Sequence, residues 1–165
     1  MALTEDKELN QTALEYGIKL PSDSLNIDTF SQILDMDEPN DREYSSTIVF
    51  NFFDQAKQTF NDLDGALGNK DLLQLSRLGH FLKGCAESLG FIQIEAKGRA
   101  IQQYGKREDE YGAKLNSDIC LERIREALDV AKDEYQVVKT SLTSFYGEMG
   151  FEYNEGMDQE DDEDA

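Results

Sequence analysis

The feature that most constrains the fold is a long, unbroken helical spacing of apolar residues near the C-terminal end of the chain. Between residues 121 and 145 the apolar positions recur at steps of three and four, as on one face of an α-helix, for roughly seven turns. They are Leu121, Ile124, Leu128, Ala131, Tyr135, Val138, Leu142 and Phe145. A helix with such a face must bury it against other elements, which favours a bundle of helices.

Three other long segments show the same helical spacing, and a shorter one precedes them. The short helix is predicted over residues 27–36, and the longer ones over about 49–67, 70–89 and 91–105. No segment alternates apolar and polar residues as a half-buried strand does. The sequence therefore predicts an all-α fold, an antiparallel four-helix bundle with a short additional N-terminal helix.

The two ends of the chain differ from its middle in composition. Residues 1–25 are polar and aperiodic, which predicts a flexible N-terminal arm. Residues 148–165 include nine acidic side chains and no Lys or Arg, which predicts a disordered acidic tail. A single domain is therefore expected over residues 26–147.

Composition and charge exclude several classes of function. The net charge of −19 argues against nucleic acid and anionic membrane surfaces as partners. There is no apolar run long enough for a transmembrane helix, and the N-terminus lacks the layout of a signal peptide. Cys85 and Cys120 do not form a disulfide framework, so free thiols of an intracellular protein are expected.

The 70–89 segment carries His80, the only histidine in the chain. Its core-facing positions are expected to be the apolar stripe Leu75, Leu78, Leu82, Cys85 and Leu89. At 100° per residue, His80 falls almost opposite this stripe. A core histidine is therefore disfavoured, whereas an incidental surface histidine remains an alternative.

Few kinds of chemistry suit this histidine. A metal site would need more ligands, and position i−3 of His80 is Arg77 rather than an acidic residue. There is no nucleotide-binding glycine loop and no motif serine for a catalytic triad. The remaining possibility is the imidazole itself as a nucleophile toward a phosphoryl group. Lys83 would supply a cation and Gly84 open space beside the ring, whereas Gly79 has no evident role.

The stretch "HFLKGCAESLG" (residues 80–90) resembles the signature of histidine-containing phosphotransfer (HPt) domains. The stretches "FFDQAKQTFNDLD" (52–64), "LSRLGHFLKG" (75–84) and "AIQQYGK" (100–106) are similar to those of the fungal phosphorelay intermediates in the osmosensing branch of that family. The resemblance covers about residues 25–147.

The resemblance implies a bundle of the HPt type with His80 as phosphoacceptor. His80 would take a phosphoryl group from the aspartyl phosphate of a hybrid sensor kinase receiver domain and pass it to the aspartate of a downstream response regulator, in osmotic or oxidative stress signalling. Lys83 and Gly84 would assist directly, and Gln102 would support the histidine by hydrogen bonding. The protein would be a stoichiometric phosphocarrier with no ATP-dependent kinase activity, which leaves its classification as an enzyme open.

The resemblance also implies partners, cofactors and location. Magnesium would be supplied by the receiver alone, and the chain would need no cofactor or metal of its own. The protein would be a monomer of the cytoplasm and nucleus. Receivers would dock on an apolar patch beside the histidine, some of whose residues could instead belong to the core: Phe30, Ile33, Leu34, Met36, Tyr44 and Ile48.

The sequence departs from the family pattern at a few positions. Cys85 replaces a frequent serine, Lys106 replaces a more usual arginine that would contact partners, and Ser46-Thr47 replaces a Lys-Gly pair. An alternative function is a helical adaptor that binds receivers without carrying phosphate. The presence of His80 favours the phosphocarrier.

Overall fold

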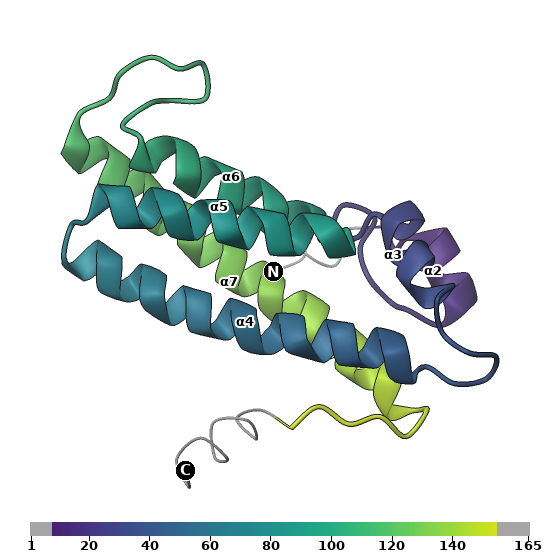
Figure 1. The fold of residues 1–165 in the computed structure, drawn as a ribbon. Coiled ribbons are helices and arrows are strands. Elements are labelled where there is room, and N and C mark those ends of the chain that lie inside the picture. Colours follow the sequence, from purple (N-terminus) through teal and green to yellow (C-terminus); the bar gives the residue numbers. More distant parts are fainter. Residues whose placement is uncertain (1–7, 155–165) are drawn as a thin grey trace, which may run out of the picture.

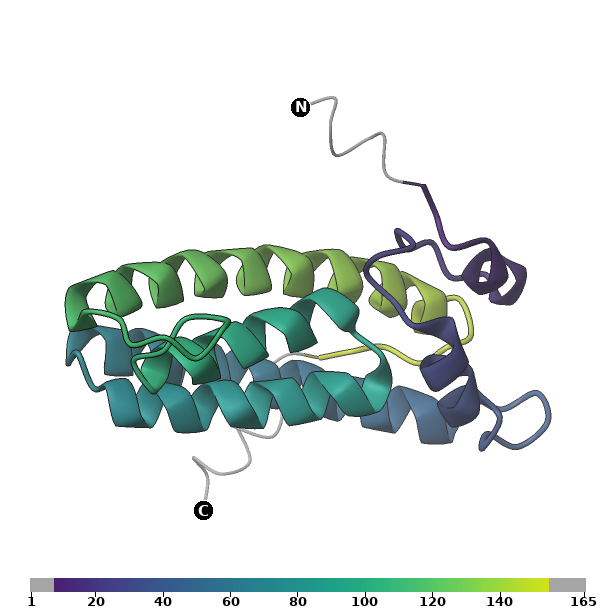
Figure 2. The same ribbon diagram turned by 90° about the horizontal axis from the view of Figure 1, so that it is seen from above.

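A computed structural model describes residues 8–154 of the chain, and these residues form helices with no named β-strand. Two short helices come first, α2 (Gln11–Tyr16) and α3 (Ile27–Leu34). Four longer helices follow: α4 (Glu43–Gly68), α5 (Leu72–Leu89), α6 (Ile92–Gly105) and α7 (Ser117–Gly147). The four longer helices lie side by side as a bundle, with α2 and α3 at one end and the α6–α7 loop at the other, as the two perpendicular views show (Figure 1, Figure 2). The all-α, four-helix architecture predicted from the sequence is confirmed.

The bundle is held by an apolar core to which every long helix contributes. Helix α5 packs against α4 and α6, and α7 packs against α6 and α4. The side chains that α7 buries include the whole predicted stripe from Leu121 to Phe145. The free backbone groups at both ends of α5 have local hydrogen-bond partners. At its start the Asp71 carboxylate accepts from the Gln74 backbone N–H, and at its end Gly90 adopts a positive φ of 82°. No helix among the described residues is long and apolar enough to cross a membrane.

The predicted flexible arm over residues 1–25 is wrong for residues 8–25, which pack on the bundle; residues 1–7 lie outside the described part of the chain. Asn10 caps α2 by accepting from the Ala13 backbone N–H. The segment buries several isolated apolar side chains rather than one helical face, which is why no periodicity marks it: Ala13, Ile18, Leu20 and Leu25.

This N-terminal segment is joined to the α5–α6 turn by backbone hydrogen bonds. The Asn26 N–H donates to the Gly90 carbonyl at 2.7 Å, and the Ile92 N–H donates to the Ser24 carbonyl at 3.2 Å. A Cβ on Gly90 would lie 2.7 Å from the Asn26 carbonyl oxygen, so glycine is needed for this approach as well as for its positive φ. The start of α3 is therefore fixed directly to the end of α5.

The boundary predicted at residue 148 falls too early, because residues 148–154 return along α4. We call these residues the C-terminal strap. The Tyr153 hydroxyl donates to the Asp54 carboxylate at 2.6 Å, and its ring lies 5.3 Å from the Phe53 ring and 5.4 Å from the Phe50 ring, centroid to centroid. Aromatic packing of this kind anchors the strap. The rest of the predicted acidic tail, residues 155–165, lies outside the described residues.

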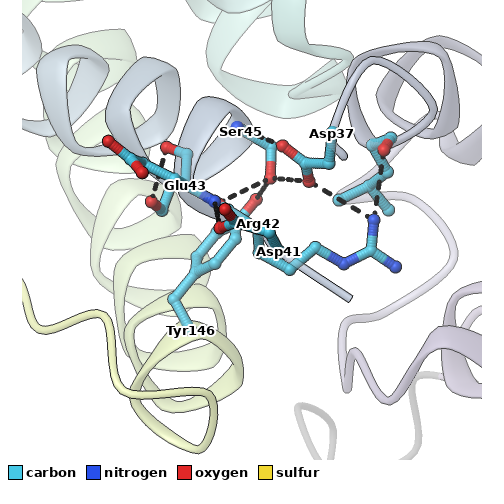
Figure 3. Close-up of polar contacts among 8 residues, drawn as sticks. Asp37, Asp41, Arg42, Glu43, Ser45 and Tyr146 are labelled. Carbon is cyan, nitrogen blue, oxygen red and sulfur yellow. Dashed lines mark hydrogen bonds and ion pairs between the residues drawn. The ribbon is translucent and has the colours of Figure 1, made fainter. Parts of the chain in front are cut away.

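A buried group of polar side chains, which we call the capping cluster, joins the α3–α4 loop to both α4 and α7 (Figure 3). It consists of Asp37, Arg42, Ser45 and Tyr146. The Asp37 carboxylate accepts from the Ser45 backbone N–H at 2.7 Å, the Ser45 hydroxyl at 2.6 Å and Arg42 Nη1 at 3.3 Å. The Tyr146 hydroxyl donates to Ser45 Oγ at 2.9 Å. Asp37 thus caps α4 from outside the helix, while residue 42, at the N-cap position, makes no side-chain cap.

Candidate functional site

His80 lies in the middle of α5 with its side chain exposed, on the face that the sequence predicts to point away from the core. Leu75, Leu82 and Leu89 on the opposite face are buried. Side chains on a helix lean toward its N-terminus, so the imidazole is directed over the turn that contains Ser76 and Arg77. The ring is therefore available to a partner that approaches α5 from solvent.

The helix beneath His80 is held against α6 by a contact in which backbone meets backbone. We call it the glycine seam: Ser76 and Gly79 of α5 against Gly98, Gln102 and Gly105 of α6. A Cβ on Gly79 would lie 2.6 Å from the Gln102 nitrogen and 2.8 Å from the Gly98 oxygen, and a Cβ on Gly105 would lie 2.7 Å from Ser76. Real Cβ atoms do not come this close, so the seam requires glycine. The role of Gly79, unexplained by the sequence, is to let α6 approach the turn of α5 that precedes His80.

The seam places Gln102 and Lys106 near the helix that carries His80. The Ser76 hydroxyl donates to the Gln102 carbonyl at 3.0 Å, which fixes the Gln102 backbone against the turn that precedes His80. Gln102 is half-buried. Lys106 is exposed and follows Gly105, so it lies at the level of Ser76. The predicted supporting roles of Gln102 and Lys106 remain predictions that this placement allows.

Lys83 and Gly84 lie one turn beyond His80. An added Cβ on Gly84 would meet no atom within 4 Å, so the surface at this position is open. Because side chains lean toward the helix N-terminus, any side chain at position 84 would lie over His80. Lys83 is half-buried and forms no ion pair within residues 8–154. Its ammonium is free to meet a phosphoryl group on the imidazole.

Cys85 was predicted to face the core but lies at the boundary between α4 and α5. Its side chain is half-buried, and its thiol is 3.8 Å from the Gln55 side-chain oxygen, to which it donates. Burial raises the pKa of the Cys85 thiol above its ordinary value, so the group stays neutral at physiological pH. It adds no charge to the surface around His80.

The predicted docking patch is only partly a surface. Phe30 and Leu34 are 0 % and 2 % exposed, so their assignment to the patch is wrong. They lie one turn apart on the inner face of α3, where the Phe30 ring packs 6.2 Å from the Phe91 ring. Met36 and Tyr44 are 63 % and 44 % exposed, and Ile33 and Ile48 are half-buried.

One exposed apolar side chain beside the histidine was missed by the sequence reasoning. Phe81, the next residue along α5, is 48 % exposed. The sequence could have identified Phe81 as exposed, because it is an apolar residue that lies just outside the Leu75–Leu89 stripe. Ile33, Met36, Tyr44 and Ile48 are the residues of the predicted patch that reach the surface, and we call them the docking patch from here on.

The site combines an exposed imidazole, a lysine with no ion pair among residues 8–154 and an open surface, all on one helix. A neutral imidazole can attack phosphorus through a ring nitrogen, and a nearby ammonium can balance the phosphoryl charge. No group of three or more His, Cys, Asp or Glu side chains within residues 8–154 is arranged to hold a metal ion.

Comparison with known proteins gives consistent matches. The family model for the Hpt domain matches residues 48–134. Multistep phosphorelay regulator 1 of Schizosaccharomyces pombe is 42 % identical over 119 residues, which cover 71 % of this chain and 40 % of that protein. Phosphorelay intermediate protein YPD1 of Saccharomyces cerevisiae is 34 % identical over 93 residues, or 56 % of this chain and 55 % of that protein. The alignments thus span about half of each relative or less.

The fold also matches a solved complex. The co-crystal structure of the Saccharomyces cerevisiae histidine phosphotransfer signaling protein Ypd1 with the receiver domain of its downstream response regulator Ssk1 superposes with a TM-score of 0.67. The similarity covers 78 % of this chain and 98 % of that one at 26 % identity.

Proposed function

Since this chain belongs to the Hpt domain family, we propose that it is a phosphorelay intermediate with His80 as its phosphoacceptor. The single observation that carries the proposal is the placement of the chain's only histidine, exposed in mid-helix beside an open glycine and a lysine that has no ion pair in the described part of the chain. The relatives named phosphorelay regulator or intermediate support the same role.

The proposed reaction moves one phosphoryl group between two proteins. A ring nitrogen of neutral His80 attacks the phosphorus of an aspartyl phosphate on a receiver domain. The P–N bond forms, the P–O bond to the aspartate breaks, and the carboxylate leaves with the bonding electron pair. Lys83 lies one turn away to balance the phosphoryl oxygens, and the second transfer reverses these bond changes on a downstream receiver.

The proposed partners are the receiver domain of a hybrid sensor kinase and one or more downstream response regulators. Support comes from the docking patch, whose exposed apolar groups are typical of an interaction surface, and from the relative solved with a receiver domain. Magnesium for the transfer would be held by the receiver. We place the relay in the cytoplasm and nucleus, a location that the resemblance to fungal relay proteins implies.

A phosphotransfer assay with radiolabelled receiver tests the proposal. The receiver domain of Ssk1, phosphorylated on its aspartate, should pass label to this chain, and the product should be labile in acid and stable in alkali. Because His80 is the only histidine, His80→Gln should abolish all such label. Uptake of alkali-stable label by that variant would overturn the proposal.

Two further variants make the test specific. Lys83→Ala should slow transfer while the thermal unfolding curve stays unchanged, because the ammonium has no partner within the described residues. Arg125→Ala, an exposed cation on α7, is the matched control and should transfer at the wild-type rate. Equal rates for all three proteins would remove Lys83 from the mechanism.

A further inference from the structure

An apolar groove with an acidic rim lies beside the docking patch, at the start of α4. It has a volume of about 440 Å³ and is open to solvent. Its apolar walls are Met36, Tyr44 and Ile48, and its rim carries the three carboxylates of Glu38, Asp41 and Glu43. We propose that this groove receives a lysine or arginine side chain of the receiver domain, an inference that rests on the proposed function and adds a determinant of partner choice to it.

The charge of the groove is not neutralised from within the chain. No basic residue lines it. Arg42 is close in sequence, but its guanidinium is directed to Asp37 at 3.3 Å (Figure 3). It also donates to the Leu34 carbonyl at 3.1 Å. Neither Glu38 nor Glu43 forms an ion pair within residues 8–154. A partner that buries the groove must therefore bring a positive charge or leave three carboxylates uncompensated.

The walls of the groove select the shape of that cation. Met36 is 63 % exposed and Tyr44 is 44 % exposed, so both offer apolar surface to an incoming side chain. Lysine and arginine lay their aliphatic stems along apolar surface while the charged end remains polar. The tyrosine ring adds a favourable surface for a cation. The combination of apolar walls and acidic rim thus fits a long basic side chain better than a small ion or a purely apolar residue.

The position of the groove identifies the partner class. Met36, Tyr44 and Ile48 belong to both the groove and the docking patch, so a receiver seated on that patch would cover the groove at the same time. A second copy of this chain is a poorer occupant, because its net charge of −19 opposes approach to an acidic surface.

The test removes charge from the rim and leaves the fold in place. The double variant Glu38→Gln, Glu43→Gln keeps Asp41, whose carboxylate accepts from the Glu43 backbone N–H and supports the start of α4. The control double variant Glu122→Gln, Glu126→Gln removes the same charge from exposed positions near the start of α7. Both are titrated with the Ssk1 receiver domain at several salt concentrations, with thermal unfolding as the check on folding.

We expect the rim variant to bind the receiver about tenfold more weakly at low salt, with a shallower dependence of affinity on salt. The control should change affinity less than twofold. Equal losses in the two variants would show that only the overall charge matters and would overturn the groove proposal, as would an unchanged affinity of the rim variant.

A set of double-mutant cycles between the rim and the receiver identifies the basic residue of the receiver that occupies the groove. Each exposed lysine and arginine of the receiver is changed in turn to methionine, and one such variant should lose its sensitivity to the rim substitutions. If no receiver variant couples to the rim, the groove holds no basic side chain and the proposal fails. Transfer of label from the receiver to His80 of the unaltered chain and of the Glu122→Gln, Glu126→Gln control reports on the proposed function separately.

Discussion

The glycine seam and the capping cluster hold their helices by opposite means. At the seam, α5 and α6 approach so closely that an added Cβ would lie 2.6 Å from a backbone nitrogen. At the capping cluster, the helices are joined through buried polar side chains with hydrogen bonds of 2.6 to 3.3 Å. The seam is sensitive to any added atom, whereas the cluster is sensitive to any removed one.

The largest effect is expected from removing the centre of the capping cluster. In Asp37→Ala, the buried Ser45 N–H and hydroxyl and the Arg42 guanidinium lose a carboxylate that is 2 % exposed. The free energy of unfolding should fall by about 3 kcal/mol, measured by chemical denaturation. Asp35→Ala, an exposed neighbour, is the control and should change it by less than about 0.5 kcal/mol. Similar losses in both would contradict a special role for Asp37.

The second-largest loss of stability is expected from adding a methyl group to the glycine seam. Gly79→Ala places a methyl group within 3 Å of two backbone atoms of α6, so the helices must separate. The gain in helix propensity, about 1 kcal/mol, offsets part of the strain, and a net loss of about 2 kcal/mol is expected. Denaturant midpoints measure this loss. A variant more stable than the wild type would show that α6 can move away from α5 without any loss of stability.

Removing one hydroxyl from the capping cluster should have a smaller effect, with a distinctive pH dependence. Tyr146→Phe loses the hydrogen bond to Ser45 and should cost about 1 kcal/mol at neutral pH. Burial raises the pKa of Tyr146 above its ordinary value; the Ser45 hydrogen bond opposes this shift and the Asp37 carboxylate adds to it.

The sign of the pH effect follows from that shift. A raised pKa in the folded state favours folding with the phenol neutral, and the unfolded chain ionises first, above about pH 10. This contribution to stability is fully present below pH 10 and is lost as pH rises further. When the free energy of unfolding is measured at several pH values between 7 and 11, it should therefore decrease less steeply with pH for Tyr146→Phe than for the wild type. An identical pH dependence of stability in the two proteins would contradict the claim that Tyr146 is buried as a neutral phenol.

The smallest change in stability, of the opposite sign, is expected at Gly84. A methyl group added at position 84 meets no atom within 4 Å, unlike one added at position 79. Gly84→Ala should therefore stabilise the fold by about 0.5 to 1 kcal/mol through its higher helix propensity. The added methyl lies over His80, so transfer from a phosphorylated receiver should slow by about tenfold if His80 is the phosphoacceptor. A variant that is both more stable and equally fast would show that the open surface serves no purpose in transfer.

These two glycines also show what the sequence could and could not predict. The position of His80 opposite the apolar stripe was sufficient to place it at the surface and to mark Gly84 as open, because both follow from helical geometry alone. Gly79 could not be explained in this way, because its reason is the α6 backbone, and the packing of one helix on another is not a property of either segment. Gly98 of α6 is the other half of the same contact.

The errors at the two ends of the chain have a related cause. Ile18, Leu20 and Leu25 are core residues that lie in loops, and Phe151 and Tyr153 pack against the core from the C-terminal strap. Neither arrangement leaves a periodic signal. Likewise, helical spacing puts Phe30 and Leu34 on the same face of α3 as the half-buried Ile33, and only the packing of α3 on the bundle separates them.

The hydrogen bond from Asn26 to the Gly90 carbonyl has a consequence for how a partner is recognised. Since α3 begins at the point where α5 ends, the apolar surface contributed by α3 and the imidazole are parts of one rigid body. Under the proposed function, a receiver that contacts both the docking patch and the imidazole would meet two groups held at a fixed separation, so its aspartate would lie at a set distance from the ring without rearrangement of this chain. Little conformational entropy would then be lost on association, which would favour rapid exchange between successive partners.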